Sequence, residues 1–115
     1  MAVKVNQAGL TKAKSLIKNG DVVHDDRDKW SEAAPTADQE NAFIKKHGFA
    51  EYAKWHLGVD ASEPEDTKAH YSFPFGDFHK VRRGGVISAE SRAAQNDHDD
   101  IAKASKTLLN LIDED

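Results

Sequence analysis

The sequence contains no cysteine among its 115 residues. Disulfide bonds, thiolate nucleophiles and cysteine-ligated zinc are therefore excluded. Small secreted domains commonly depend on disulfides, so the lack of cysteine favours a cytoplasmic location. No stretch approaches the roughly 20 apolar residues of a membrane-spanning helix, and the first residues, MAVKVNQAGL, lack the apolar run of a signal peptide. We therefore expect a soluble cytoplasmic protein with no membrane partner.

The chain also lacks the excess of basic residues that is typical of nucleic-acid-binding domains. It has 16 Lys and Arg against 20 Asp and Glu, so its formal net charge is −4. Basic residues gather in segments 1–20 and 76–95, and acidic residues in 21–42 and 96–115. The net charge argues against a dedicated nucleic-acid binder, whereas the basic segments leave a local contact with an anion open.

No short catalytic or nucleotide-binding motif is present. The sequence has no HExxH, no calcium-loop spacing, no GxGxxG, no P-loop and no nucleophile elbow. We therefore expect no catalytic residue, no metal site and no cofactor. One alternative stays open, because His56, His70 and His79 could meet in space and serve a metal-dependent enzyme.

Apolar residues recur with helical spacing over much of the chain, of which 38% is hydrophobic and 31% charged. This pattern predicts an all-α fold, a single domain over residues 1–115. We expect a compact arrangement of four to five short helices with an irregular aromatic loop near 70–79. The four main predicted helices run over about 7–18, 36–47, 81–95 and from 97 toward the C-terminus.

Helix boundaries are predicted from capping residues. Thr36 and Gln39 have the spacing of a capping box, and Gly48 is a suitable stop for that helix. A further short helix is predicted from Phe49 to Leu57, and one or two helical turns after Ser62. Segment 21–35 shows no helical period, apart from a short extended piece at 22–23.

The stretch HYSFPFGDFHKVRRGG, residues 70–85, gathers four aromatic residues around one proline and then turns basic. Its aromatics could stack on nucleic-acid bases, dock a partner protein, or fill the core. Gly85, Ala89 and Ala93 are four residues apart and give the following helix a face of small side chains. We favour the third interpretation, in which Phe73, Phe75 and Phe78 fill the space over or near that face.

Six residues are candidates for a partner-binding or anion-binding site. Lys80, Arg82 and Arg83 cluster before a predicted helix start, where free backbone N–H groups favour anions. Arg92 lies among small residues and would need a carboxylate partner if it were buried. Trp55 and His56 are adjacent aromatic side chains that could form part of a recognition surface, although tryptophans such as Trp30 and Trp55 are more typical of a core or of its half-buried cover.

Several motifs together resemble a known group of sequences. They are a Trp-His-Leu-Gly run at 55–58, Phe-Pro-Phe-Gly at 73–76, and an arginine-containing helix that ends in Arg92, Ala93 and Gln95. The pattern is similar to a family of short, functionally uncharacterised bacterial and phage domains, some associated with phage head-maturation proteases. The resemblance covers about residues 50–112 and implies no proteolytic activity, because the protease part is absent.

These observations support a non-enzymatic, phage-related module that acts by protein–protein interaction or self-association. The first alternative is nucleic-acid or anion binding through the basic cluster at 80–85. The second is the metal-dependent enzyme with dispersed histidines.

Overall fold

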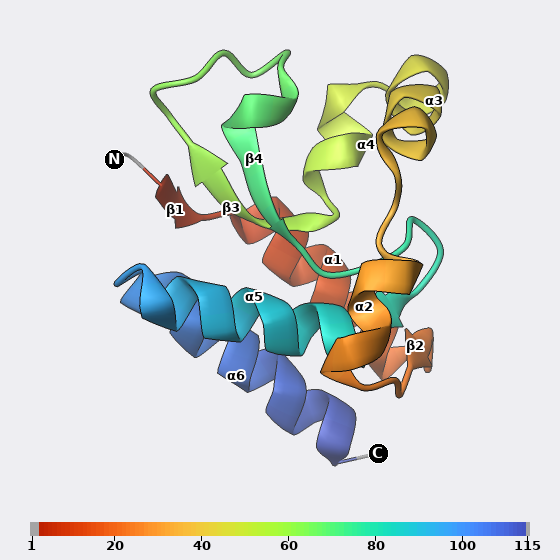
Figure 1. Cartoon of the computed structure of the whole chain (residues 1–115), viewed down its shortest axis with the longest axis vertical. Helices are drawn as coiled ribbons and strands as arrows, with labels where there is room; N and C mark the ends of the chain where they lie inside the picture. The colour runs from red at the N-terminus through yellow and green to blue at the C-terminus, as the bar shows by residue number, and fades with distance from the viewer. Residues whose placement is uncertain (1–2, 115) are drawn as a thin grey trace.

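The computed structural model describes residues 3–114, which form a mixed α/β fold (Figure 1). The predicted all-α fold is wrong, because two small sheets accompany the helices. The helices are α1 (Gln7–Lys18), α2 (Arg27–Ala33), α3 (Ala37–His47), α4 (Phe49–Ala53), α5 (Arg83–Gln95) and α6 (Asp99–Asp113), with a 3-10 turn at Lys68–His70. The strands are β1 (Val3–Val5), β2 (Val22–Val23), β3 (His56–Asp60), β4 (Tyr71–Pro74) and β5 (Val81–Arg82).

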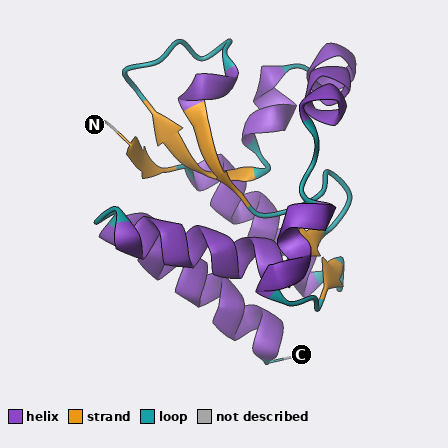
Figure 2. Cartoon of the chain, viewed as in Figure 1, coloured by secondary structure: helices purple, strands orange, loops and turns teal. Residues whose placement is uncertain are grey.

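The larger sheet has three antiparallel strands in the order β1-β3-β4 (Figure 2). Val5 pairs with Gly58, and Gly58 pairs on its other side with Ser72. A second sheet joins β2 and β5 in parallel, with Val22 opposite Val81. Both sheets connect segments that are far apart in the sequence, so they hold the N-terminal third against the rest of the chain.

The strand β3 replaces the end of a predicted helix. The sequence pattern predicted a helix from Phe49 to Leu57, but the helix α4 ends at Ala53 and the chain is extended from His56. A helix as short as α4 is marginal by itself. The extended form of residues 56–60 is stabilised because β1 and β4 satisfy backbone groups on both sides of it.

Other helix predictions had mixed outcomes. The helix 7–18 and the capping box at Thr36 are confirmed, with Gln39 N–H donating to Thr36 Oγ1 at 3.2 Å. The extended piece at 22–23 is confirmed as β2. The helix α2 was missed. The helical turns expected after Ser62 are reduced to the 3-10 turn at Lys68–His70, and the backbone N–H and hydroxyl of Ser62 donate to Asp60. The aromatic loop is not wholly irregular, because its first residues form β4.

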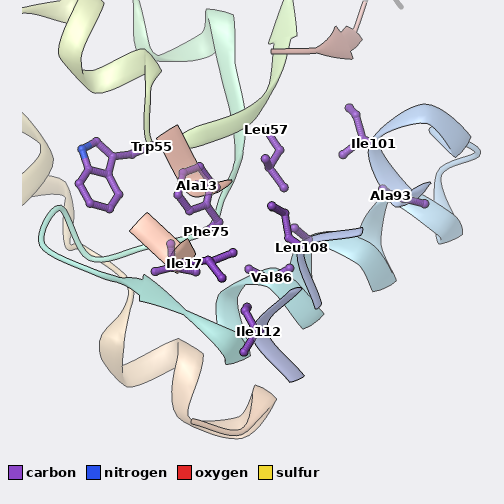
Figure 3. Close-up of a cluster of buried hydrophobic side chains, with 13 residues drawn as sticks. Ala13, Ile17, Trp55, Leu57, Phe75, Val86, Ala93, Ile101, Leu108 and Ile112 are labelled. Carbon is purple, nitrogen blue, oxygen red and sulfur yellow. The ribbon is translucent and has the colours of Figure 1, made fainter. Parts of the chain in front are cut away.

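The core lies between the sheet and the pair of helices α5 and α6, which run side by side in Figure 1. Helix α1 contributes Ala13 and Ile17, and β3 contributes Leu57 (Figure 3). The buried hydrophobic cluster comprises Ala13, Ile17, Trp55, Leu57, Phe75, Val81, Val86, Ala89, Ala93, Ile101, Ala102, Leu108 and Ile112. Within residues 3–114, no helix is long and apolar enough to cross a membrane.

The aromatic residues of segment 70–85 contact different parts of the fold. Phe75 is fully buried, which confirms its predicted role in filling the core. The rings of Tyr71 and Phe49 stack at 6.3 Å, and the ring of Phe73 lies 5.8 Å from that of His98. Phe73 and Phe78 are half-buried and pack against the edge of the core, so the core-filling interpretation is confirmed in full for Phe75 and in part for the other two rings.

The small-residue face of α5 is buried, as predicted, and part of its cover is an aromatic ring from another helix. A side chain at Gly85 would meet the ring of Trp30 at 2.9 Å and the carbonyl of Phe75 at 3.1 Å. Trp30 comes from α2, and this close approach explains why glycine is needed at position 85. Ala89 and Ala93 continue the face and are 3% and 0% exposed.

We expect Ala89→Leu to lower the free energy of unfolding by about 1–3 kcal/mol, because the added methylenes have no free space. Ala94 lies on the same helix and is exposed, so Ala94→Leu is the matched control and should change stability little. Urea denaturation of both variants measures the difference. Equal stability of Ala89→Leu and the parent would contradict the tight packing of this face.

Candidate functional site

A cleft of about 680 Å³ lies between α2, α3 and the loop of residues 76–80. Helix α3 supplies one of its walls through side chains spaced three and four residues apart, which share one face of the helix. The lining residues are Glu32, Ala33, Pro35, Gln39, Ala42, Phe43, Lys46, His47, Asp77, Phe78, His79 and Arg82.

Helix α3 has no buried residue and stands away from the α5–α6 pair (Figure 1). Tyr52 donates a hydrogen bond to Glu40 Oε2 at 3.0 Å, and Lys68 Nζ lies 3.4 Å from Glu40 Oε1. Burial raises the pKa of Tyr52, and the charge of Glu40 raises it further, so the phenol keeps its proton and can donate. Glu40 therefore anchors α3 to the body of the fold through Tyr52 and Lys68.

The aromatic part of the cleft is a stacked pair of rings. Phe43 from α3 and Phe78 from the loop have centroids 4.2 Å apart and an interplanar angle of 12°. His47 lies 4.6 Å from Phe43, and Tyr52 and Trp55 each lie 6.0 Å from Phe78, measured between ring centroids. The half-buried pair of rings therefore gives the cleft an apolar surface, and neighbouring aromatic side chains hold both rings in place.

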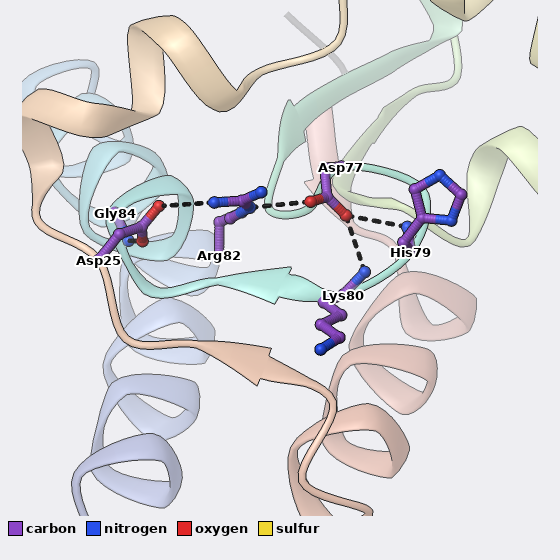
Figure 4. Close-up of polar contacts among 6 residues, drawn as sticks. All are labelled: Asp25, Asp77, His79, Lys80, Arg82 and Gly84. Carbon is purple, nitrogen blue, oxygen red and sulfur yellow. Dashed lines mark hydrogen bonds and ion pairs between the residues drawn. The ribbon is translucent and has the colours of Figure 1, made fainter.

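The loop 76–80 is held in shape by Asp77. Its Oδ1 accepts N–H bonds from His79 at 2.9 Å and Lys80 at 2.8 Å, and its Oδ2 accepts from Arg82 Nε at 2.8 Å (Figure 4). Burial opposes ionisation of Asp77, but these donors outweigh it, so the pKa of Asp77 lies below its usual value. The loop tolerates a φ of 71° at Phe78, a conformation that is unfavourable for a bulky residue.

Arg82 joins this loop to the start of α5. Its Nη1 lies 3.5 Å from Asp25 Oδ2, while Asp25 Oδ1 accepts the N–H of Gly84 at 2.7 Å (Figure 4). The Asp25 side chain is only 9% exposed. A carboxylate of the chain itself thus occupies the helix N-terminus that the sequence suggested for an external anion.

The other predicted site cations are dispersed. Arg83 pairs with Asp113 through Nε at 2.9 Å and Nη2 at 3.3 Å, which ties α5 to the end of α6. The side-chain hydrogen bond from Arg83 lowers the pKa of Asp113. Lys80 and Arg92 are exposed, Lys80 beside the cleft loop and Arg92 near the end of α5. The structure therefore does not bring Arg92 together with the basic cluster.

Trp55 and His56 lie in the core. Trp55 is 5% exposed, stacks on Phe75 at a centroid distance of 5.8 Å, and has Lys12 Nζ 5.6 Å from its ring. His56 is 3% exposed, and its Nδ1 lies 2.9 Å from the carbonyl oxygen of Tyr52. A carbonyl can only accept, so Nδ1 carries the proton. Both residues support the fold beneath the cleft.

The three histidines of the metal alternative have separate surroundings. His56 is buried against Tyr52, His70 Nδ1 lies 2.8 Å from the carbonyl of Glu63, and His79 is exposed on the cleft loop. Among the residues with a described placement, no group of three or more His, Asp or Glu is arranged to hold a metal ion.

Sequence reasoning missed most of the cleft. Neither Phe43 nor Asp77 was predicted to be a site residue. One signal was available, because an aspartate two residues before an N–H donor in a glycine-containing turn is typical of an Asx turn. Nothing in the sequence indicated that α2 and the 76–80 loop lie beside α3, since these contacts depend on the sheets.

We expect Arg82→Gln to lower the free energy of unfolding by about 1–3 kcal/mol, because Asp25 and Asp77 both lose a charged donor while partly or largely buried. Arg83→Gln is the matched control, since it removes the same charge from a more exposed pair, and its melting temperature should change little. Thermal melts of both variants check this. Equal melting temperatures would contradict a structural role for Arg82.

Comparison with family models, with curated proteins and with solved structures finds no match to this chain.

Proposed function

We propose that the chain is a non-enzymatic module that binds a segment of another protein in the cleft between α2, α3 and the loop 76–80. The carrying observation is the Phe43–Phe78 pair, a half-buried apolar surface inside a cleft of about 680 Å³. Ligand sites combine apolar and aromatic walls with a few placed polar groups. Gln39, His47 and His79 supply such groups around the ring pair.

The arrangement of the rings favours a polypeptide over a nucleic acid. Single-stranded nucleic acids bind by stacking bases on free aromatic faces. Here Phe43 and Phe78 cover each other's faces, and His47 lies against Phe43. Edges of stacked rings suit the apolar side chains of a peptide, which need area and shape but no flat platform.

Anion binding through the 80–85 cluster stays a prediction, and the geometry gives it less support than the cleft. Asp25 and Asp77 already pair with Arg82, and Asp113 pairs with Arg83. The phage relationship rests on the sequence motifs around Trp55 and Phe75, and the cytoplasmic location on the lack of cysteine.

The proposal is tested by selecting binders from a random peptide library displayed on phage and mapping the enriched peptides by NMR. We expect backbone shifts at Phe43, Phe78 and His79. Phe78→Ala should weaken binding by about tenfold or more, as for a buried aromatic contact in an interface. Phe49→Ala, which alters a half-buried ring outside the cleft, is the control and should bind as the parent does.

Two results would count against the cleft. The first is a set of peptides whose shifts map to another surface. The second is unchanged affinity in Phe78→Ala, provided its melting curve shows a folded protein. Sedimentation distinguishes binding of another protein from self-association. Self-association predicts that the parent protein forms a dimer and that Phe78→Ala dissociates it.

A further inference from the structure

The charges around the cleft are unequally distributed, and this distribution indicates the chemistry of the partner. Lys46, His47 and His79 line one part of the cleft, from the last turn of α3 and from the loop. Lys45 and Lys80 are exposed neighbours of these residues. Two separate segments therefore place basic side chains beside the Phe43–Phe78 pair.

Of the two carboxylates that line the cleft, Asp77 has an ion-pair partner and Glu32 has none among the described residues. Asp77 pairs with Arg82 at 2.8 Å. Glu32 lines both the cleft and an adjoining hollow, and that hollow also contains Lys29 and Arg82. Lys46 and His79 have no carboxylate within 4.0 Å in the part of the chain that the structure describes. The charges of the cleft lining without an ion-pair partner among the described residues are thus Lys46 on α3 and Glu32 on α2, and the exposed Lys45 and Lys80 add positive charge beside Lys46.

Helix capping explains only some of these cations. Basic residues in the last turn of a helix interact favourably with its dipole, which accounts for Lys45, Lys46 and His47 as structural features of α3. His79 and Lys80 are on a loop, where Asp77 binds their backbone N–H groups and leaves their side chains exposed. Their side chains have no such structural explanation.

Resting on the proposed function, we propose that the bound segment is an acidic peptide with an apolar anchor residue. The anchor contacts Phe43 and Phe78, and the carboxylates that flank it lie toward Lys46, His47 and His79. Electrostatic complementarity of this kind sets partner choice and orientation more than it sets total affinity.

The net charge of the whole chain and the local charge of the cleft predict opposite preferences for the charge of a peptide. With a formal charge of −4, general electrostatic attraction predicts that cationic peptides bind more tightly than anionic ones. The local charges of the cleft predict the reverse order. Binding of related peptides of different charge therefore distinguishes the cleft from nonspecific attraction.

The experiment uses three fluorescein-labelled peptides with a central phenylalanine flanked by glutamates, by glutamines or by lysines. Fluorescence polarisation at pH 7 and low salt measures their affinities for the full chain. We expect the glutamate peptide to bind about tenfold more tightly than the glutamine peptide, with the lysine peptide weakest. Added salt should reduce the difference between the glutamate and glutamine peptides.

A matched pair of variants assigns the charge preference to the cleft. Lys46→Gln should reduce the glutamate-to-glutamine affinity ratio about threefold, because the lost charge acts on the flanking carboxylates of the glutamate peptide. Lys18→Gln is the control, because Lys18 is also an exposed lysine in the last turn of a helix but lies on α1, away from the cleft. It should keep the parent ratio.

The possible failures are distinguishable. Equal binding of the glutamate and glutamine peptides in the cleft would overturn the acidic partner and leave the proposed function standing. Tightest binding of the lysine peptide would overturn it as well. Failure of all three peptides, together with an empty library selection, would overturn both proposals. Sedimentation could also show a dimer that Phe78→Ala dissociates. That result would identify a second copy of the chain as the occupant of the cleft and overturn the proposal of a separate acidic partner.

Discussion

Phe75→Ala is expected to lower the free energy of unfolding by about 3–5 kcal/mol. Phe75 is 0% exposed and stacks on Trp55, so truncation removes a ring from the centre of the core and leaves a cavity. Its backbone also joins the two sheets, since its N–H donates to Trp55 at 3.3 Å and its carbonyl accepts from Arg82 at 3.0 Å. A loss of this size is a large fraction of the stability of a small domain.

Chemical denaturation followed by tryptophan fluorescence measures the effect. Phe75→Leu keeps much of the side-chain volume and should lose clearly less stability than the alanine variant. Phe78→Ala changes a half-buried ring of the same segment and should also be milder. A denaturation curve for Phe75→Ala that overlays the parent curve would show that the ring does not fill the core.

Local sequence signals predicted the elements that depend on local interactions. Helix α1 follows the spacing of its apolar residues, and α3 begins where the Thr36 capping box predicts. The last helix was predicted from its apolar period, although it begins after His98 and its cap has no side-chain hydrogen bond. These features need only neighbours within one or two helical turns.

Apart from the extended piece at 22–23, the strands could not be predicted in the same way, because their stability comes from partners far along the chain. Residues Val3–Val5 pair with Gly58–Asp60, and Val22–Val23 pair with Val81–Arg82. Strands of two to five residues carry too little alternation to be distinguished from loops or from the end of a helix. The error at residues 56–57 arose from this effect.

The candidate site was predictable only in its components. The basic residues at 80–83 were identified, but two of their three acidic partners lie far away in the sequence. Asp77 belongs to the same stretch, whereas Asp25 precedes α2 and Asp113 ends α6. Such pairs depend on tertiary contacts that composition does not reveal. The burial of Trp55 agrees with the core interpretation of that residue, whereas nothing in the sequence indicated that His56 is buried as well.

Lowering the pH from 6.5 toward 4 is expected to destabilise the fold through His56. Burial lowers the pKa of His56 from 6.5 to about 4, and its hydrogen bond with Tyr52 and the charge of Glu40 offset only part of that effect. Above pH 6.5, the folded and unfolded states both hold a neutral imidazole. Between the two pKa values only the unfolded state gains a proton, so stability falls with falling pH.

The total loss from this group is about 3 kcal/mol, at about 1.4 kcal/mol for each unit of pKa difference. Between pH 6.5 and 5, the loss of stability from His56 can be measured apart from that of the carboxyl groups. The carboxyls with lowered folded pKa values, such as Asp77 and Asp60, have ordinary values of 3.8 and lose their contribution only in more acidic solution. They act in the same direction but at lower pH.

Urea denaturation at several pH values between 7 and 5 measures this slope. His56→Asn removes the titrating ring, while its amide can still donate to the Tyr52 carbonyl, so the variant should show a nearly flat profile over this range. His24 is exposed, and His24→Asn should keep the slope of the parent. If His56→Asn and the parent lost stability in parallel as the pH fell, the acid sensitivity would have to come from other groups, and His56 would not be buried in its neutral form.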